Sequence, residues 1–409
     1  MASSPRTVDE HRAVVAALLP PMPAQDVPIA AALGRVLATD VVAAVSLPSF
    51  DNSAMDGYAV RVADLAGAGP DTPVVLPVAA DVPAGRTDGP PLVPGTAHRI
   101  MTGALLPAGA DAVLPVEQTD GGVTSVELRA VPALGAHVRR VGEDTTAGDV
   151  VLPAGTVIGP AHIGVAAAVG AATVPVRRRP VVLVLSTGSE LVAPGTPLAP
   201  GQIYESNGPM LAAAVTEAGG QAELLRFVPD DVAEFLDRLD RRLHRADPVD
   251  MVLTSGGVSA GAYEVVKDAF AGRGVEFVRV AMQPGGPQGA GRVDELGGVA
   301  VVTLPGNPVS SQVSFEVFVR PALRTALGHP DPYRLVRTAV LGERWTSPVG
   351  RRQFRRAVFA PDGVTVREVG TAASHMLGAL ARAECLVVVP EDVTELEPDT
   401  EVETWLLTG

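Results

Sequence analysis

The run VVLVLSTGSE, residues 181–190, decides the fold of the largest part of the chain. Its unbroken aliphatic half is typical of a strand buried on both faces, and Ser, Thr and Gly follow where the strand ends. The same pattern returns in MVLTSGGVSAG at 251–261 and in VVTLPGNPVSS at 301–311. Segments with helical periodicity separate these strands, so the alternation predicts an α/β domain with a parallel-type sheet over residues 177–329.

The three strand ends give the first indication of a binding site. Carboxyl ends of parallel strands meet at one edge of a sheet, where such sheets bind ligands. Glycines there let backbone N–H groups face a ligand, so the loops together form a candidate phosphate cradle. Tight turns that simply need glycine would explain each loop taken singly. No loop matches GxxxxGKS or a strand-following GxGxxG, which disfavours an ATPase or a dinucleotide enzyme.

Carboxylates gather near the same strand ends. Glu190 closes the first loop, Glu264 follows the second, and Asp230 and Asp231 open a segment with helical periodicity. Mg²⁺ prefers carboxylate oxygens and bridges to substrate phosphates, so acids beside phosphate-cradling loops indicate a divalent cation. Taken alone, Asp230 or Asp231 is more typical of a helix N-cap, and Glu264 of an exposed helix position.

The rest of the chain divides into further segments. Residues 46–141 consist of short Val-rich runs broken by Pro and Gly, which indicates a β-rich domain. The flanking segments 25–45 and 142–176 share an Ala, Val and Gly composition, so we expect them to pair with each other and to make the β-rich part an insertion. Residues 330–409 show strand patterns again, with a hairpin on the Pro-Asp-Gly turn of QFRRAVFAPDGVTVREV.

Composition narrows the class of protein. A chain of 409 residues is too long for one hydrophobic core, and its formal net charge of −14 disfavours nucleic-acid binding. The single cysteine, Cys385, lies in the apolar run ECLVVVP and is expected to be buried, which suits a reducing compartment. No apolar stretch reaches membrane-spanning length and the start lacks an export signal. We therefore expect a soluble cytoplasmic protein with neither a membrane nor a nucleic-acid partner.

Lysine and asparagine are almost absent from the chain, so the few positions that carry them are candidates for a specific role. The chain has a single lysine, Lys267, and three asparagines, Asn52, Asn207 and Asn307. Arg and Asp cannot replace these side chains where a compact ammonium or a neutral donor is needed. Chance placement is the alternative. Asn52 belongs to FDNSAMDGYAV, a candidate site loop that presents Asp56, although alone the run is typical of an Asx-rich turn between domains.

Six motifs follow one another along the chain: FDNSAMDGYAV, RIMTGA, VGEDTTAGDVVLPAGT, LSTGSEL, SGGVSAGAYEVVK and LPGNPVS. In this order they resemble the MoeA family of molybdopterin molybdenumtransferases, whose neuronal relative is the E domain of gephyrin. The resemblance covers nearly the whole chain and implies a multidomain α/β plus β protein. Its parts are an N-terminal helix in 1–24 that packs on the α/β domain, an elongated linking domain from 25–45 and 142–176, a β-rich inserted domain at 46–141, a MogA-like α/β domain at 177–329 and a C-terminal β-barrel-like domain at 330–409.

The resemblance also implies an activity. Members insert molybdate into adenylylated molybdopterin with release of AMP, assisted by Mg²⁺, as homodimers that work beside other proteins of molybdenum cofactor biosynthesis. The family's catalytic acids fall on Asp56, Asp144, Glu190, Asp230 and Glu264, with Glu190 and Glu264 as candidate Mg²⁺ ligands. The substrate-binding positions fall on Thr102, Arg139, Arg140, Ser186, Gly188, Gly256, Gly257, Ser259, Lys267, Arg279, Pro305, Gly306, Asn307, Pro308 and Ser374.

The chain departs from the family pattern at several positions. Gln283 and Gly286 stand where other members carry lysines in a KPGKP-like run, so oxyanion binding is expected to rest on arginines, Lys267 and backbone amides. Ser189 and Ala262 stand where acids are common, and Glu264 where Asp is usual. Two alternatives stay open: a MogA-like molybdopterin adenylyltransferase, and a non-catalytic scaffold like gephyrin.

Overall fold

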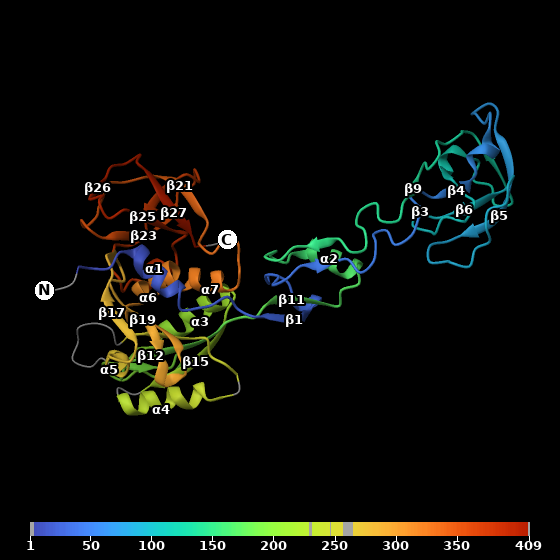
Figure 1. Cartoon of the computed structure of the whole chain (residues 1–409). Coiled ribbons are helices and arrows are strands. Elements are labelled where there is room, and N and C mark those ends of the chain that lie inside the picture. The colour runs from blue at the N-terminus through green and yellow to red at the C-terminus, as the bar shows by residue number, and fades with distance from the viewer. Residues whose placement is uncertain (1–3, 229–230, 246, 257–264, 408–409) are drawn as a thin grey trace. The chain divides into compact units, whose positions relative to one another are not determined.

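The computed structural model describes residues 4–228, 231–245, 247–256 and 265–407 (Figure 1). They form two compact units: unit 1 consists of residues 1–25 and 177–409, and unit 2 of residues 26–176. Unit 1 holds an α/β domain and a C-terminal barrel, whereas unit 2 is built mostly from short strands.

A six-stranded sheet in the order β15-β12-β16-β20-β19-β17 is the centre of the α/β domain. Four of its strands run parallel: β12 (Val181–Thr187), β15 (Gln221–Val228), β16 (Met251–Ser255) and β20 (Val299–Leu304). Strands β19 (Pro287–Val293) and β17 (Val275–Arg279) continue the sheet in antiparallel pairing. The predicted parallel-type sheet is confirmed, and it is mixed at one side.

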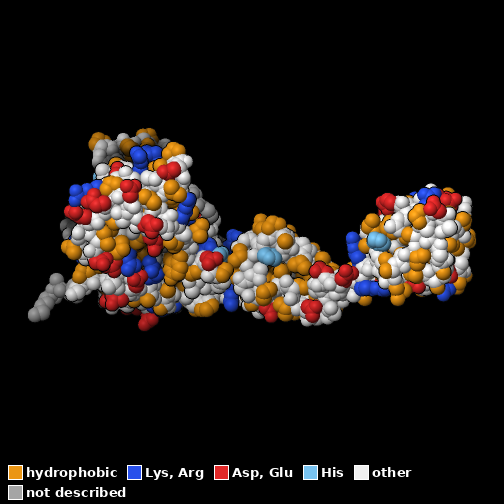
Figure 2. All heavy atoms as spheres, turned by 90° about the horizontal axis from the view of Figure 1, so that it is seen from above, with side chains coloured by type: hydrophobic (Ala, Val, Ile, Leu, Met, Phe, Trp, Pro, Cys, Tyr) orange, Lys and Arg blue, Asp and Glu red, His pale blue; other side chains and the backbone are white. Residues whose placement is uncertain are grey.

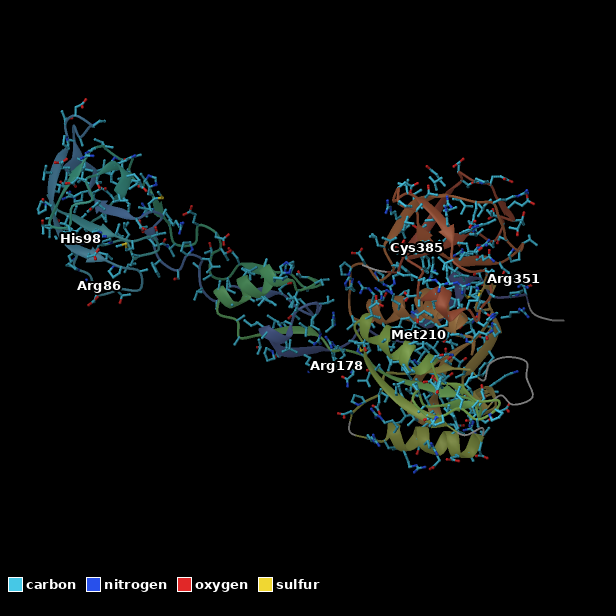
Figure 3. All side chains as sticks on the ribbon, turned by 180° about the vertical axis from the view of Figure 1, so that it is seen from behind. Arg86, His98, Arg178, Met210, Arg351 and Cys385 are labelled. Atoms are coloured by element: carbon cyan, nitrogen blue, oxygen red, sulfur yellow. The ribbon has the colours of Figure 1, made fainter. Side chains whose placement is uncertain are left out.

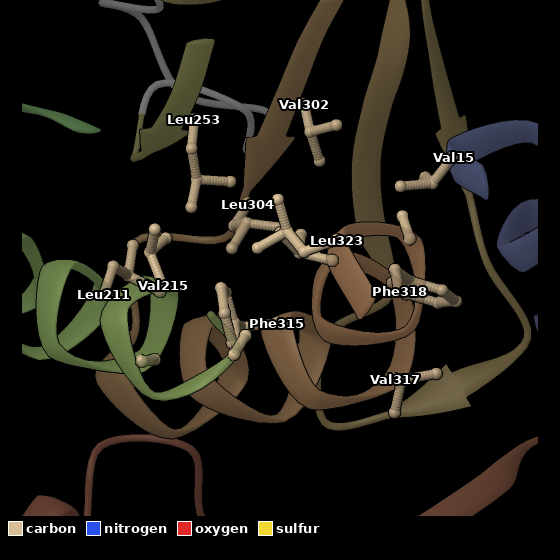
Figure 4. Packing of buried hydrophobic residues seen from close by; sticks show 14 of the residues in the cluster. Val15, Leu211, Val215, Leu253, Val302, Leu304, Phe315, Val317, Phe318 and Leu323 are labelled. Atoms are coloured by element: carbon tan, nitrogen blue, oxygen red, sulfur yellow. The ribbon is translucent and has the colours of Figure 1, made fainter. Parts of the chain in front are cut away.

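Helices cover both faces of this sheet because successive strand residues point to opposite sides. Val182 and Val184 of β12 belong to one core, which also contains residues of α1 (Val8–Ala16), α3 (Asn207–Glu217), α6 (Pro308–Ser314), the π-helix Phe315–Val319 and α7 (Arg320–Ala326). Leu183 and Leu185 belong to the other core, with α4 (Val232–Leu243) and α5 (Val265–Phe270). Figure 4 shows part of the first core.

Helix α1 begins with the capping box that the sequence predicts. Thr7 Oγ1 accepts a hydrogen bond from the Glu10 N–H at 3.2 Å, and Glu10 Oε2 accepts one from the Thr7 N–H at 2.8 Å. The buried side of the helix carries Val8, His11 and Val15. Val8 and Val15 join the core of the α/β domain, so the N-terminal helix packs on that domain.

The C-terminal part of unit 1 is a closed barrel. Its five strands are β21 (Val336–Leu341), β23 (Arg352–Phe359), β24 (Thr365–Glu368), β25 (Cys385–Val389) and β27 (Glu401–Leu406), and the β23–β25 pairing closes the ring. Strands β23 and β24 form the predicted hairpin.

Cys385 is fully buried in the barrel (Figure 3), and burial raises the pKa of its thiol to about 12. Smaller elements are β18 (Met282–Gln283), which pairs with β23, the pair β22 (Trp345–Thr346) and β26 (Glu395–Leu396), and α8 (Leu377–Leu380).

Unit 2 contains two groups of strands. In the first, β1 (Ala24–Pro28) pairs with β11 (Thr173–Arg177) and β2 (Val41–Val42) with β10 (Val150–Leu152), beside α2 (Pro160–Ala168). The second is a sheet of β7 (Ala112–Pro115), β4 (Gly57–Val60), β6 (Ala97–Ile100), β5 (Val74–Val82) and β8 (Ser125–Leu128), in that order. Strands β3 (Asn52–Ser53) and β9 (Val138–Arg139) pair beside it. The boundaries given to the linking and inserted domains stay predictions.

The surface and the helices carry two further facts. Acidic and basic side chains are interspersed over the face of unit 1 that Figure 2 shows. Within the described part of the chain, no helix combines the length and the apolar character that crossing a membrane requires.

Candidate functional site

A cleft of about 930 Å³ in unit 1, the main cleft, lies at the carboxyl ends of β12, β16 and β20. The loops that follow these three strands line it, together with the segment 203–207 that leads into α3. The structure thus brings together the strand ends that the sequence singled out. Predicted site residues in its lining are Ser186, Gly188, Glu190, Gly256, Pro305, Gly306, Asn307 and Pro308.

Glycine is required where two of these loops touch. Gly256 has φ +98°, in the region that side chains disfavour, and a Cβ there would lie 3.2 Å from the Thr187 carbonyl oxygen. A Cβ on Gly306 would lie 3.4 Å from the Gly256 Cα. The backbone at Thr187, Gly256 and Gly306 therefore comes close together at this end of the sheet. The Gly256 N–H donates to the Leu304 carbonyl at 3.1 Å, which ties the end of β16 to the end of β20.

Two carboxylates line the same cleft, those of Glu190 and Glu205. The Glu190 carboxylate lies close over the first loop, since a Cβ on Gly188 would be 2.7 Å from Glu190 Oε2. Across the described residues, no group of three or more His, Cys, Asp or Glu side chains is arranged to hold a metal ion. Mg²⁺ commonly takes only one or two protein carboxylates and completes its shell with water and substrate phosphate, so the cleft fits this ion in the presence of a phosphate ligand.

Asn207 is a lining residue that the sequence analysis did not assign to the site. Its Nδ2 donates to Ser255 Oγ and to the Gly306 carbonyl oxygen, both at 2.7 Å. A second asparagine makes a similar link, because Asn307 Nδ2 donates to Ser374 Oγ at 2.8 Å. The rarity of asparagine in this chain was the signal that pointed to both positions, although it said nothing about their partners.

A smaller cleft of about 280 Å³ lies beside the first, between the α/β domain and the barrel. Arg279 and Ser374, both predicted site residues, line it, and Pro287 and Ser310 line both clefts. Arg351, labelled in Figure 3, adds a second guanidinium that the sequence analysis did not assign to the site. Gln283 and Gly286, which replace the family's lysines, lie in the same lining. Gln283 Oε1 accepts a hydrogen bond from Gln353 Nε2 at 3.2 Å.

Comparison with known proteins identifies the family. Three family descriptions match in sequence: the MoeA N-terminal region (domain I and II) at residues 6–170, a probable molybdopterin binding domain at 183–325 and the MoeA C-terminal region (domain IV) at 338–407. Molybdopterin molybdenumtransferase 2 of Mycobacterium tuberculosis is 57% identical over 98% of this chain and 100% of its own length. The chain belongs to the MoeA family. The resemblance inferred from the six motifs is confirmed.

More distant MoeA relatives agree in sequence and in structure. The molybdopterin molybdenumtransferase of Haemophilus influenzae is 34% identical over 94% of this chain and 95% of its own length. The crystal structure of the molybdopterin biosynthesis MoeA protein from Pyrococcus horikoshii matches with a TM-score of 0.85 and 31% identity, over 99% of this chain and 100% of that one. The predicted multidomain fold is therefore confirmed. The lining of the main cleft, apart from His375, belongs to the segment that matches the probable molybdopterin binding domain.

The MoeA N-terminal region holds a separate group of predicted site residues. Asp56 and Thr102 are in contact, since Asp56 Oδ1 accepts hydrogen bonds from the Thr102 N–H at 2.7 Å and from Thr102 Oγ1 at 2.9 Å. These bonds lower the pKa of Asp56, the backbone bond most strongly. Arg140 is paired with Asp51 at 2.6 Å rather than with Asp56. Arg139 lies on β9.

Other predicted site residues have no part in the two clefts as described. Asp144 lies in an exposed turn, where its N–H donates to the Leu47 carbonyl at 3.0 Å. Lys267 lies on α5, whose first residue Val265 lines the main cleft, while Lys267 itself is outside the lining. Four further positions, Asp230, Gly257, Ser259 and Glu264, lie outside the described residues.

Proposed function

We propose that this MoeA family member is a transferase of molybdenum cofactor biosynthesis that inserts molybdate into adenylylated molybdopterin and releases AMP. The observation that carries the proposal is the pairing of two clefts in unit 1 with different chemistry. The larger is lined by strand-end glycine loops suited to phosphate, and the smaller by Arg279 and Arg351, which suit an oxyanion. Because Pro287 and Ser310 line both, a nucleotide and molybdate bound there would be neighbours.

The larger cleft suits the pyrophosphate and adenylate of the substrate. The N–H groups of Gly188 and Gly306 are the candidate phosphate donors, whereas the Gly256 N–H already donates to the Leu304 carbonyl at 3.1 Å. Glu190, and Glu205 beside it, would hold Mg²⁺ in contact with the phosphate oxygens. Bound there, the ion would neutralise the charge that develops on those oxygens as the pyrophosphate breaks.

The smaller cleft suits molybdate, a tetrahedral dianion. Arg279 and Arg351 supply charge, and the hydroxyls of Ser310 and Ser374 supply hydrogen bonds to its oxygens. When the two thiols of the pterin replace one oxygen of molybdate, that oxygen leaves as water with the two thiol protons. Water also cleaves the pyrophosphate bond to give AMP and the phosphorylated pterin. The protein holds the two reactants in the relative position that the reaction needs and keeps competing reactants out of the clefts.

The proposal extends to assembly and location. We place the enzyme in the cytoplasm as a homodimer, in which Asp56 and Thr102 of one subunit complete the cleft that Glu190 lines in the other. The support is the division of the predicted residues between two separately folded units, since unit 2 carries Asp56 and Thr102 and unit 1 carries Glu190. A two-fold dimer would make two equivalent sites of this kind.

The experiment is calorimetry of AMP and of molybdate with the full chain in the presence and absence of Mg²⁺, followed by an insertion assay with adenylylated molybdopterin. We expect Mg²⁺-dependent AMP binding and molybdate-dependent release of AMP from the substrate. Formation of adenylylated molybdopterin from ATP and molybdopterin would instead identify an adenylyltransferase. If the chain binds no nucleotide under any of these conditions, the result would favour the alternative of a non-catalytic scaffold.

A further inference from the structure

We propose that Asn207 is a positioning residue, which links Ser255 at the end of β16 to Gly306 in the loop after β20 and thereby sets the position of the Gly306 loop in the phosphate cradle of the main cleft. This inference rests on the proposed function, because it assumes that the cleft binds the adenylate phosphate. Asn207 is not among the residues that the family resemblance assigned to the site. The inference comes instead from its contacts.

The two hydrogen bonds of Asn207 reach both loops at once. Ser255 ends β16 and directly precedes Gly256, and the Gly306 carbonyl belongs to the loop after β20. Asn207 Nδ2 lies 2.7 Å from the Ser255 Oγ and 2.7 Å from the Gly306 carbonyl oxygen, so it joins the two segments. The backbones of Gly256 and Gly306 are in contact near this amide, since a Cβ added to Gly306 would lie 3.4 Å from the Gly256 Cα. Loss of the amide would remove this side-chain link at the Gly306 carbonyl, and only the bond from the Gly256 N–H to the Leu304 carbonyl, 3.1 Å long, would then hold Gly256 to the end of β20.

Helix α3 presents this amide from a rigid base. Asn207 is the first residue of the helix, and Glu205 Oε1 accepts a hydrogen bond from the Gly208 N–H at 2.5 Å, which fixes the start of the helix. One and two turns further on, Leu211 and Val215 are fully buried in the core of the sheet (Figure 4). Because the helix cannot shift without disturbing this core, the position of the amide is set by the fold and not by the ligand.

Only an amide fits the two partners. A backbone carbonyl can only accept, so Nδ2 must face Gly306, and the opposite orientation of the amide would place Oδ1 against another oxygen. Asn207 Oδ1 is buried and has no hydrogen-bond partner among the described residues. The amide thus keeps a position in which half of its bonding capacity is unused, which is more typical of functional sites than of cores.

The test is AMP binding to the full chain in the presence of Mg²⁺, with wild type, Asn207→Ala and Asn207→Asp. At about pH 7.5 we expect Asn207→Ala to weaken binding roughly five- to thirtyfold, the effect of losing one or two net hydrogen bonds. Asn207→Asp should bind more weakly still, because its carboxylate repels the Gly306 carbonyl and the phosphate. Gln221→Glu adds the same charge to the same unit at the amino end of β15 and should bind like wild type.

The pH dependence separates positioning from general damage. When the new carboxyl is protonated in Asn207→Asp, it can donate one hydrogen bond to a loop again. Its affinity relative to wild type should therefore rise as the pH falls to about 5 and should exceed that of Asn207→Ala, so that the two variants exchange order. Each variant is compared with wild type at the same pH, because Glu190, Glu205 and His375 line the same cleft and are present in every variant.

Ser255→Ala gives a second route to the same answer. It removes one acceptor and leaves the bond to Gly306, so we expect weaker binding than wild type and little further loss when it is combined with Asn207→Ala. Binding by Asn207→Ala within twofold of wild type, parallel pH curves for Asn207→Ala and Asn207→Asp, or additive losses in the double variant would each overturn the inference. Failure of wild type to bind AMP would instead overturn the proposed function.

Discussion

Asp56 receives both of its hydrogen bonds from Thr102, and both reach the same carboxylate oxygen, Oδ1. The other oxygen, Oδ2, takes no part in these two bonds. Because the bonds favour the ionised carboxyl, the pKa of Asp56 is held below its ordinary value although the side chain is exposed. In chemical terms Asp56 is a fixed carboxylate, suited to orienting a cation or a water molecule and poorly suited to donating a proton.

This relationship predicts the behaviour of Thr102→Val. Loss of the hydroxyl removes one of the two bonds, so the pKa of Asp56 should rise toward its ordinary value while the backbone bond keeps part of the shift. Carbon-13 NMR of the aspartate carboxyls, assigned with Asp56→Asn, measures it. Thr365→Val is the matched control, since the Thr365 N–H donates to Asp362 Oδ1 and Thr365 Oγ1 donates to Asp362 Oδ2 in a barrel hairpin. It should shift Asp362 and not Asp56. An unchanged titration of Asp56 in Thr102→Val would show that the hydroxyl plays no part.

The smaller cleft predicts a gain from a single substitution. Gln283→Lys places an ammonium in a lining that already holds Arg279 and Arg351. We expect molybdate to bind about fivefold more tightly, equivalent to about 1 kcal/mol, measured by calorimetry. The lysine can also donate to Gln353 Oε1, which is buried and without a partner among the described residues. Gln118→Lys adds the same charge at an exposed position in unit 2 and should have no effect. Equal affinity of Gln283→Lys and wild type would mean that the arginines and amides already saturate the oxyanion.

Local sequence rules predicted the elements of this fold better than the contacts between them. The capping box of Thr7 and Glu10 and the Pro-Asp-Gly hairpin depend only on neighbours in the chain, and both form. The antiparallel pairing of β17 with β19 depends on which neighbouring strand each one pairs with. The amino-acid composition of a strand does not specify whether it pairs in parallel or antiparallel.

The same limit applies to the site. Strand-end glycines predicted the cleft because parallel strands must end at a common edge. The Asn207 bonds to Ser255 and Gly306, and the entry of Arg351 into the smaller cleft, join segments that are distant in the chain. Their partners follow from tertiary packing, which residue patterns do not specify. The relation between Asp56 and the clefts likewise stays a prediction, since these residues belong to different units.

A buried histidine predicts part of the pH dependence of stability. His11 of α1 is fully buried against Phe318, with ring centroids 4.7 Å apart, and burial lowers its pKa from 6.5 to about 4. In the unfolded chain His11 therefore binds a proton below about pH 6.5, whereas in the folded chain it binds one only below about pH 4. Stability from this residue is complete above that window and is lost as the pH falls through it, by at most about 3 kcal/mol.

Replacement by Phe keeps the aromatic contact and removes the proton site. The difference in free energy of unfolding between wild type and His11→Phe should change in favour of the variant as the pH falls from about 7 to about 4.5. Urea unfolding followed by circular dichroism measures it. His244→Phe is the control, because His244 is exposed and should leave the wild-type pH dependence in place. Parallel curves for wild type and His11→Phe would show that His11 titrates alike in both states.

Complementation tests whether two subunits share each site. Asp56→Ala and Glu190→Ala alter residues of different units, and each variant should be inactive in the insertion assay by itself. If each cleft joins unit 2 of one subunit with unit 1 of the other, a mixed dimer places both defects in one cleft and leaves the second cleft intact. Random exchange makes half of the dimers mixed, each with one working site of two, so activity should return to roughly a quarter of wild type.

The control for complementation is a pair of variants within one unit. Glu190→Ala mixed with Asn307→Ala should recover nothing, because both residues line the same cleft of unit 1 and every cleft of a mixed dimer then carries one defect. Orthogonal affinity tags on the two variants allow mixed dimers to be isolated before the assay. Inactive mixed dimers of Asp56→Ala with Glu190→Ala would place both residues in the site of a single chain. Recovery only in that pair, and not in the control pair, requires a site built from two chains.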